Sequence, residues 1–178
     1  MRIISGKYKG RHIRVHKNFS ARPTTDFAKE NLFNFLNNYF DFNITTVLDL
    51  FGGTGSMSYE FASRGCPSVD ILEKDFKSFD FINKVLTELK IAEVNPIHTD
   101  AFQYLRKCRK QYDLIFADPP YQHKEIDILP DLIFENNLLK PKGWFILEHS
   151  DKHKFSTHPA FREHREYGSV NFSIFAEK

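Results

Sequence analysis

The tetrapeptide Asp118-Pro119-Pro120-Tyr121 is the segment whose residue types point most directly to a chemical reaction. Two consecutive prolines hold the backbone φ at about −65° and supply no N–H, so the local carbonyl groups remain open to an incoming donor. The Asp118 carboxylate and the Pro119 carbonyl could each accept one hydrogen bond from an –NH2 group, while Tyr121 stacks on the attached aromatic ring. The segment therefore predicts a site for an exocyclic amine.

An aromatic exocyclic amine is a weak nucleophile because its lone pair is delocalised into the ring, so orientation must provide most of the catalysis. Two acceptors can hold the nitrogen in line with an activated methyl group, and such positioning contributes up to ~7–11 kcal/mol. Asp118 can then accept the proton that the methylated nitrogen releases, without needing a raised pKa. We therefore expect methyl transfer to an amine, with Asp118, Pro119, Pro120 and Tyr121 at the reacting centre.

A glycine-rich turn, Phe51-Gly52-Gly53-Thr54-Gly55, follows the apolar run 47–50. Glycines at such a turn let the backbone approach a ligand closely. A dinucleotide-binding GxGxxG pattern would start at Gly53 and require glycine or alanine at position 58, where Ser58 stands. The incomplete pattern argues against an NAD-dependent oxidoreductase, which would also leave the two prolines unexplained.

Three successive predicted strands end in a carboxylate, at Asp49, Glu73 and Asp100. Parallel strands bring their carboxyl ends to one crevice, where Glu73, 20 residues after Gly53, can accept both ribose hydroxyls of an adenosine. S-adenosylmethionine suits this crevice because it carries an adenosine and a sulfonium cation but no phosphate, although NAD could still use one carboxylate. No His or Cys cluster accompanies the carboxylates, so we expect no metal. The expected cofactor contacts are Asp49, Phe51, Gly53, Gly55, Glu73, Asp100 and Ala101.

Residues 46–148 repeat a pattern of strand, turn and helix, which predicts a parallel sheet covered by helices. Pro96 removes one ladder donor from the third strand, which places that strand at a sheet edge and agrees with the order 3-2-1. Residues 161–167 and 170–174 alternate around Gly168, which predicts an antiparallel hairpin. The expected fold class is α/β, a Rossmann-like, mostly parallel sheet with an antiparallel C-terminal hairpin. Strands are expected at 47–50, 69–73, 95–99, 114–117 and 144–148, and helices at 76–89 and around Leu32, Phe35, Leu36, Tyr39 and Phe40.

Residues 1–22 are strongly basic, although the net charge of the whole chain is only +2. Seven Lys and Arg side chains occur there without an acidic residue, and alternating apolar residues around two glycines predict a hairpin over 2–15. Two interpretations stay open: an edge hairpin that cations protect from aggregation, or an arm that binds nucleic-acid phosphates, which we favour. The candidate RNA contacts are Arg2, Lys7, Lys9, Arg11, Arg14 and Arg22.

A chain of 178 residues can enclose one hydrophobic core, so we expect a single catalytic domain over 23–178 with 1–22 as an N-terminal extension. Cys66 and Cys108 lie far apart and suggest neither a disulfide framework nor a zinc site. The N-terminus lacks an apolar signal stretch, and no run of about 18 apolar residues occurs. We therefore expect a soluble, cytoplasmic monomer without a membrane partner.

Together these segments resemble the bacterial 16S rRNA guanine-N2 methyltransferases of the RsmD type, over nearly the whole chain. The resemblance implies a class I S-adenosylmethionine-dependent methyltransferase sheet with a small N-terminal β-hairpin. It rests on Arg2-Ile3-Ile4-Ser5-Gly6 with Lys9-Gly10-Arg11, on Arg22-Pro23-Thr24-Thr25-Asp26, on Leu48 to Gly55, on Ser63-Arg64-Gly65 and on Asp118 to Tyr121.

The same resemblance implies methylation of guanine 966, in customary rRNA numbering, with S-adenosylhomocysteine as the other product. It implies 16S rRNA or a partly assembled small ribosomal subunit as the partner. It also implies that Asp49, Gly53, Glu73 and Asp100 surround the cofactor, while residues 118–121 surround the base. The chain departs from the family at Phe27 and Lys29, where arginines are usual, which puts an RNA contact there in doubt.

Other classes share parts of this pattern. A DNA adenine or cytosine amino-methyltransferase uses the same Asp-Pro-Pro-Tyr chemistry, but a target-recognition domain would have little room in 178 residues. A protein-glutamine methyltransferase would not require the basic N-terminus. A non-catalytic RNA-binding assembly factor would show no cofactor binding in calorimetry.

Overall fold

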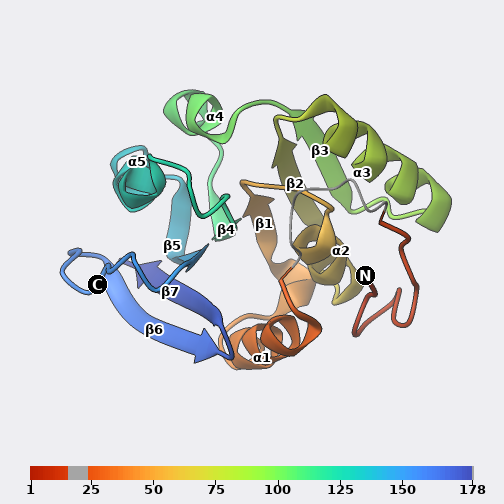
Figure 1. Ribbon diagram of the computed structural model, residues 1–178, viewed down its shortest axis with the longest axis horizontal. Helices are drawn as coiled ribbons and strands as arrows, with labels where there is room; N and C mark the ends of the chain where they lie inside the picture. Colours follow the sequence, from red (N-terminus) through yellow and green to blue (C-terminus); the bar gives the residue numbers. More distant parts are fainter. Residues whose placement is uncertain (16–23, 178) are drawn as a thin grey trace.

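The computed structural model describes residues 1–15 and 24–177, which form a seven-stranded sheet with helices on both faces (Figure 1). The strands are β1 (Thr46–Asp49), β2 (Ser68–Glu73), β3 (Val94–His98), β4 (Tyr112–Ala117), β5 (Leu139–His149), β6 (Phe161–Tyr167) and β7 (Val170–Ala176). The helices are α1 (Asp26–Leu36), α2 (Ser56–Ser63), α3 (Phe76–Leu89), α4 (Ala101–Lys107) and α5 (Leu129–Glu135), with the short 3-10 helices η1 (Phe42–Ile44) and η2 (Ile126–Ile128).

The strand order across the sheet is β3-β2-β1-β4-β5-β7-β6. The first five strands in this order pair in parallel, whereas β7 pairs antiparallel with both β5 and β6. The mostly parallel sheet, the antiparallel C-terminal strands and the order 3-2-1 are therefore confirmed. β3 lies at the sheet edge, the position in which a strand tolerates a proline such as Pro96.

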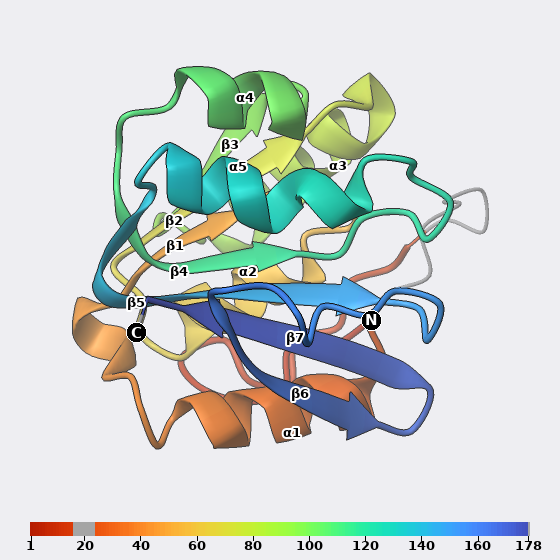
Figure 2. The same ribbon diagram turned by 90° about the vertical axis from the view of Figure 1, so that its left-hand side faces the viewer.

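Helices α1, α2 and α3 pack on one face of the sheet, and α4 and α5 pack on the other, where Figure 2 shows them above β4 and β5. Successive residues of a strand point to opposite faces, so two apolar cores form. In β4, Leu114 and Phe116 lie in the core under α1 to α3, whereas Ile115 and Ala117 lie in the core under α4 and α5. By the same alternation, the residue that follows Ala117 points to the face that carries α1 to α3.

α3 has the predicted bounds, but β5 does not. The sequence predicts a start at residue 144, where a short apolar run begins, whereas the strand begins at Leu139. Lys142 takes a positive φ of 66°, and the pairing between β4 and β5 shifts register near the start of both strands. β5 therefore continues through an irregular segment, beyond the start that the sequence predicts.

The first helix is shorter than its apolar periodicity predicts. α1 ends at Leu36, and the N–H of Asn37 caps it by donating to the carbonyl of Phe33 at 3.0 Å. Tyr39 and Phe40 leave the helix and contact Trp144, with ring centroids 4.7 and 5.0 Å apart. Packing against β5 therefore replaces the predicted last helical turn.

The N-terminal segment forms an antiparallel loop and not the two regular strands that the sequence predicts. Its two sides meet at an isolated bridge between Arg2 and His12. Backbone hydrogen bonds run across it from Ile13 N to Met1 O at 2.9 Å, from Ile3 N to Arg11 O at 3.1 Å and from Gly10 N to Ile3 O at 2.9 Å. The residues of the turn bind α2 as well as each other. The N–H groups of Lys7 and Tyr8 donate to the carbonyl and hydroxyl oxygens of Ser63, at 2.7 and 2.9 Å.

Glu60 of α2 is fully buried and joins three segments of the chain. Its oxygens accept hydrogen bonds from the N–H groups of Ile4 and Ser5, at 2.8 and 3.1 Å, and from Arg64 Nε at 2.8 Å. Lys29 Nζ of α1 lies 3.9 Å from Glu60 Oε2, and burial lowers the pKa of Lys29. Lys29 is only 1% exposed, so it is an internal partner of Glu60 and offers no surface contact to RNA.

Residues 1–15 and 24–177 contain neither a membrane-spanning helix nor a cluster of metal ligands. No helix there combines the length and apolarity needed to cross a membrane. Within the same ranges, three or more His, Cys, Asp or Glu side chains never gather in a way that could hold a metal ion.

We expect Gly6→Ala to destabilise the fold more than Gly10→Ala, although both glycines have a φ of 80°. A Cβ at Gly6 would clash with the carbonyl of Ser63, whereas a Cβ at Gly10 would meet nothing within 4 Å. Both variants carry the cost of a left-handed conformation, about 1–2 kcal/mol, and Gly6→Ala adds about 1–3 kcal/mol of overpacking. Urea unfolding measures the difference. Equal free energies of unfolding would mean that the N-terminal loop does not pack on α2.

Candidate functional site

The carboxyl ends of β1, β2 and β4 lie side by side and bring the glycine-rich turn next to the Asp-Pro-Pro-Tyr segment. Backbone hydrogen bonds extend beyond the strands: Leu50 N donates to Phe116 O at 2.9 Å, and Gly52 N donates to Leu72 O at 2.7 Å. The turn is thus fixed to both neighbouring strands before α2 begins. This is the crevice in which ligands bind in open parallel sheets.

Two glycines of the turn take conformations that other residues rarely adopt. Gly53 has a φ of 52° and Gly55 a φ of 81°, and a Cβ on Gly55 would clash with the phenol ring of Tyr59. The Tyr59 hydroxyl is buried, and no group in the described part of the chain hydrogen-bonds to it. An unpaired buried hydroxyl therefore lies close to the start of α2.

Glu73 at the end of β2 holds the turn through both of its oxygens. Oε2 accepts from Gly53 N at 2.7 Å, and Oε1 accepts from Asp75 N at 2.7 Å. The predicted proximity of Gly53 and Glu73 is found. Each carboxylate oxygen has a further lone pair, so Glu73 can still accept hydrogen bonds from a ligand.

Asp49 at the end of β1 is buried and has only hydroxyl and amide partners. Ser58 Oγ donates to Asp49 Oδ2 at 2.7 Å, and Phe51 N donates to Oδ1 at 3.4 Å. Burial raises the pKa of Asp49 to about 7, helped by the charge of Glu73 and opposed by these hydrogen bonds. Ser58, which breaks the dinucleotide pattern, thus orients a carboxylate of the site.

Asp118 follows β4 and has no hydrogen-bond donor among the described residues, although it is mostly enclosed by protein. Burial raises its pKa well above the ordinary value, and the charges of Glu148 and Asp49 raise it further. The chemistry expected from the sequence required no raised pKa here, so this shift is an additional finding. Pro119 is buried beside it, whereas Pro120 is exposed.

Glu148, near the end of β5, belongs to the same site and was not among the predicted site residues. It is 3% exposed, its Oε2 accepts from Thr24 Oγ1 at 2.8 Å, and its Oε1 accepts from the hydroxyl of Tyr121 at 3.3 Å. Burial raises its pKa to about 7, against the effect of these two hydrogen bonds. The usable signal was a charged residue that closes an apolar strand, the same signal that identifies Glu73.

Asp100 differs from the other strand-end carboxylates because it is already paired. It caps α4 by accepting from Gln103 N at 3.1 Å, and Lys74 Nζ lies 3.0 Å from its Oδ2. Burial opposes the change, yet these hydrogen bonds lower the pKa of Asp100. Ala101 is the buried first residue of α4.

Three aromatic rings connect the glycine-rich turn with the loop that follows the Asp-Pro-Pro-Tyr segment. His123 stacks on Phe102 with ring centroids 4.8 Å apart, and the Phe51 ring meets both at 6.2 and 6.3 Å. Phe51 was a predicted cofactor contact. Phe102 and His123 were missed, because their contact depends on the folding of the loop after β4.

The predicted RNA contacts have partners on different elements of the fold. Arg2 lies beside the start of α1, where it pairs with Asp26 at 2.9 Å. The residues of the turn lie where α2 and α3 end: Lys7 pairs with Glu93 at 2.8 Å, and Arg11 Nη1 donates to the carbonyl of Leu89 at 2.8 Å. The sequence shows no local counter-charge, but the fold supplies one for Arg2 and for Lys7. Lys9 and Arg14 are exposed, and Arg22 lies outside the described residues.

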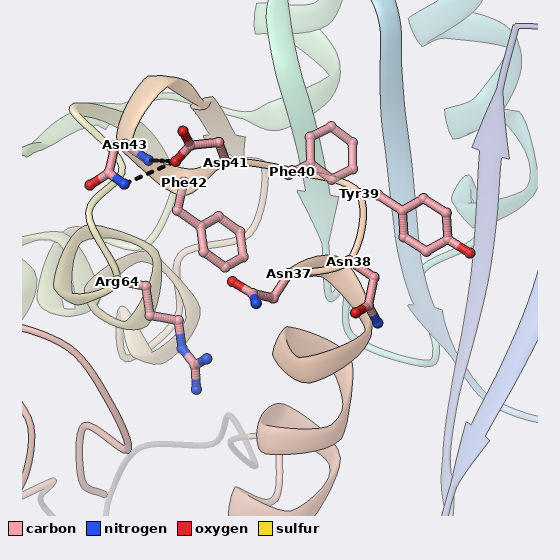
Figure 3. A pocket seen from close by; sticks show the side chains of 8 residues that line it. All are labelled: Asn37, Asn38, Tyr39, Phe40, Asp41, Phe42, Asn43 and Arg64. Carbon is pink, nitrogen blue, oxygen red and sulfur yellow. Dashed lines mark hydrogen bonds between the residues drawn. The ribbon is translucent and has the colours of Figure 1, made fainter.

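A hollow of about 440 Å³ lies away from this site, between the end of α1, η1 and the end of α2 (Figure 3). It contains none of the predicted site residues. α2 begins at the glycine-rich turn and ends beside this hollow, so the hollow lies at the far end of α2 from the turn. The lining residues are Asn37, Asn38, Tyr39, Phe40, Asp41, Phe42, Asn43 and Arg64.

Two solved structures share this architecture. A hypothetical protein of Thermus thermophilus superposes with a TM-score of 0.87 at 22% identity, over 99% of each chain. An RNA methyltransferase of Salinibacter ruber, solved in complex with S-adenosyl-L-homocysteine, superposes with a TM-score of 0.68 at 14% identity, over 86% of this chain and 92% of the other. At these identities the likeness shows the fold alone.

Sequence comparison extends the likeness to a family. The family model described as Conserved hypothetical protein 95 matches residues 1–176. The ribosomal RNA small subunit methyltransferase D of Buchnera aphidicola subsp. Baizongia pistaciae is 31% identical, and the match covers 98% of this chain and 91% of the relative. This chain therefore belongs to the conserved hypothetical protein 95 family, the family of the ribosomal RNA small subunit methyltransferases D.

Proposed function

We propose that this protein transfers a methyl group from S-adenosylmethionine to the exocyclic N2 of a guanine in 16S rRNA, at the position corresponding to guanine 966. The observation that carries the proposal is the Asp118 carboxylate, enclosed beside the glycine-rich turn and without a donor among the described residues. The name of the Buchnera relative, a small subunit rRNA methyltransferase, supports the substrate. The partner is 16S rRNA, free or in a partly assembled small subunit.

The residues at the carboxyl edge fit the proposed cofactor. When bound, S-adenosylmethionine would supply an electrophilic methyl group on a sulfonium cation. Glu73 has lone pairs left for ribose hydroxyls, and Asp49 offers a carboxylate that lacks a cationic partner in the described structure. The unpaired hydroxyl of Tyr59 supplies a donor beside the turn. The Salinibacter methyltransferase of similar fold was solved with the demethylated product, S-adenosyl-L-homocysteine.

Asp118 and Pro119 supply the chemistry on the side of the amine. Their carboxylate and carbonyl oxygens can each accept one N–H of the exocyclic amine and hold its lone pair toward the methyl group. After transfer, the nitrogen carries a positive charge and loses one proton. Because burial raises the pKa of Asp118, this carboxylate is a stronger proton acceptor than an exposed one.

Glu73→Ala should weaken S-adenosylmethionine binding by about 1.5–3 kcal/mol, the range for a hydrogen-bonding partner that is charged. The variant loses the ribose acceptors and the hydrogen bond to Gly53 N. Titration calorimetry measures the affinity. Glu73→Gln keeps one acceptor oxygen and should lie between the variant and the native protein. Unchanged affinity in Glu73→Ala would remove this residue from the cofactor site.

Asp118→Ala should lower the single-turnover rate of methyl transfer at least ~100-fold, the lower limit for loss of a positioned acid or base. Affinity for S-adenosylmethionine should stay within a few fold, because this carboxylate binds the target amine and not the cofactor. Asp118→Asn keeps one acceptor oxygen and should retain more activity. A near-native rate for Asp118→Ala on rRNA would refute the positioning role of Asp118.

Substitution of Lys9 and Arg14 tests whether the N-terminal loop binds RNA, because both side chains are exposed. Replacing both by Gln should weaken RNA binding and flatten the plot of log affinity against log salt, by roughly 0.7–0.9 for each phosphate that the variant no longer neutralises. The matched control replaces the exposed Lys84 and Lys142 by Gln and removes the same charge. Equal salt slopes for the two variants would favour edge protection as the role of the basic residues.

A further inference from the structure

We infer that Glu148 binds the N1–H of the target guanine while Asp118 holds its N2 amine, so that Glu148 determines which base the site accepts. The inference rests on the proposed function and names the feature of the substrate that the site recognises. It starts from a buried carboxylate that lies outside the Asp-Pro-Pro-Tyr segment and yet contacts Tyr121 of that segment.

Glu148 and Asp118 occupy equivalent positions on neighbouring strands. Ala117 of β4 pairs with Leu147 of β5, and each carboxylate belongs to the residue that follows. Ala117 and Leu147 both point into the core under α4 and α5, so the alternation along a strand directs both carboxylates to the opposite face. The hydrogen bond from Thr24, just before α1, agrees with that orientation. Asp118 and Glu148 therefore form an adjacent pair of acceptors.

No cationic side chain among the described residues pairs with either carboxylate. Every ion pair found among residues 1–15 and 24–177 involves other carboxylates. Among the described residues, Glu148 accepts from the hydroxyls of Thr24 and Tyr121, and each of its oxygens has a further lone pair. Buried acceptors of this kind require donors, and two neighbouring carboxylates require two neighbouring donors.

Guanine presents such a pair of donors. Its exocyclic N2 amine is attached next to N1, which carries a hydrogen. The ring nitrogens next to the adenine and cytosine amines, N1 and N3 respectively, carry a lone pair instead and would face Glu148 with repulsion. The carboxylate pair thus distinguishes the proposed reaction from the adenine and cytosine methylation that the same tetrapeptide could serve. A site built to bind a substrate N–H rejects an analogue that lacks it by roughly 10⁴- to 10⁵-fold.

The base 2-aminopurine tests this pairing, because it keeps the 2-amine but has a lone pair at N1. The probe is an rRNA fragment with guanine or 2-aminopurine at the target nucleotide, used free and after assembly with ribosomal proteins. Single-turnover transfer from radiolabelled S-adenosylmethionine gives the rate on each base. We expect the native protein to be at least ~100-fold slower on 2-aminopurine.

Glu148→Gln should change this preference. The amide of Gln can donate an N–H to the N1 lone pair of 2-aminopurine, whereas its carbonyl accepts the guanine N1–H less strongly than a carboxylate does. We therefore expect the ratio of the guanine rate to the 2-aminopurine rate to fall at least ~10-fold. Glu148→Ala is the matched control, because it lacks a donor and should lose activity on guanine without gaining any on 2-aminopurine.

The outcomes separate the inference from the proposed function. Equal native rates on the two bases would overturn the inference without the need for any variant. An unchanged ratio in Glu148→Gln, with native thermal stability and S-adenosylmethionine affinity, would overturn it too and leave Glu148 a structural partner of Thr24. Methylation of guanine N2 by the native protein would keep the proposed function in both cases. If the native protein does not methylate the guanine RNA, the proposed function fails and the inference fails with it.

Discussion

The crowding of three carboxylates at the carboxyl edge of the sheet is the constraint on which the rest of the site depends. Asp49 ends β1, Asp118 follows β4, and Glu148 lies near the end of β5. All three lie on the same face of the sheet, and burial raises the pKa of each. Since the folded chain holds these protons more tightly than the unfolded chain, their ionisation reduces stability as the pH rises from about 4 toward 7. The arrangement therefore opposes folding near neutral pH and favours any ligand that brings positive charge or N–H donors.

Other buried carboxylates show that this crowding is specific to one edge. Glu60 is fully buried, but two backbone N–H groups, Arg64 and Lys29 satisfy it. Asp70 of β2 is held by Lys110 at 2.7 Å, and hydrogen bonds from Lys110 and Tyr112 lower its pKa although burial opposes them. Burial alone thus does not mark the site. A buried carboxylate without a cationic partner among the described residues does, because strongly perturbed pKa values cluster at functional sites.

Much of this site follows from residues that are close in sequence. The contact between Gly53 and Glu73 could be predicted, because a parallel unit of strand, helix and strand brings successive strand ends together. The part played by Ser58 could not, since the sequence shows only that it breaks a dinucleotide pattern. Glu148 is linked to Thr24 across 124 positions, and no local pattern reports so distant a hydrogen bond. The ion pair of Lys7 with Glu93 was missed for the same reason, 86 positions apart.

The N-terminal loop shows how an internal ion cluster can shape a surface. Glu60 and Ser63 bind its backbone along α2, so the backbone that carries its cations is held against the fold. α2 has eight residues and spans about 12 Å, at 1.5 Å per residue, a distance that one RNA strand can follow. Under the proposed function, a strand that enters at Tyr121 can therefore meet cations along its backbone without ordering a flexible arm. A surface ordered in advance loses little entropy on binding, which is the advantage of holding a charged loop with a buried carboxylate.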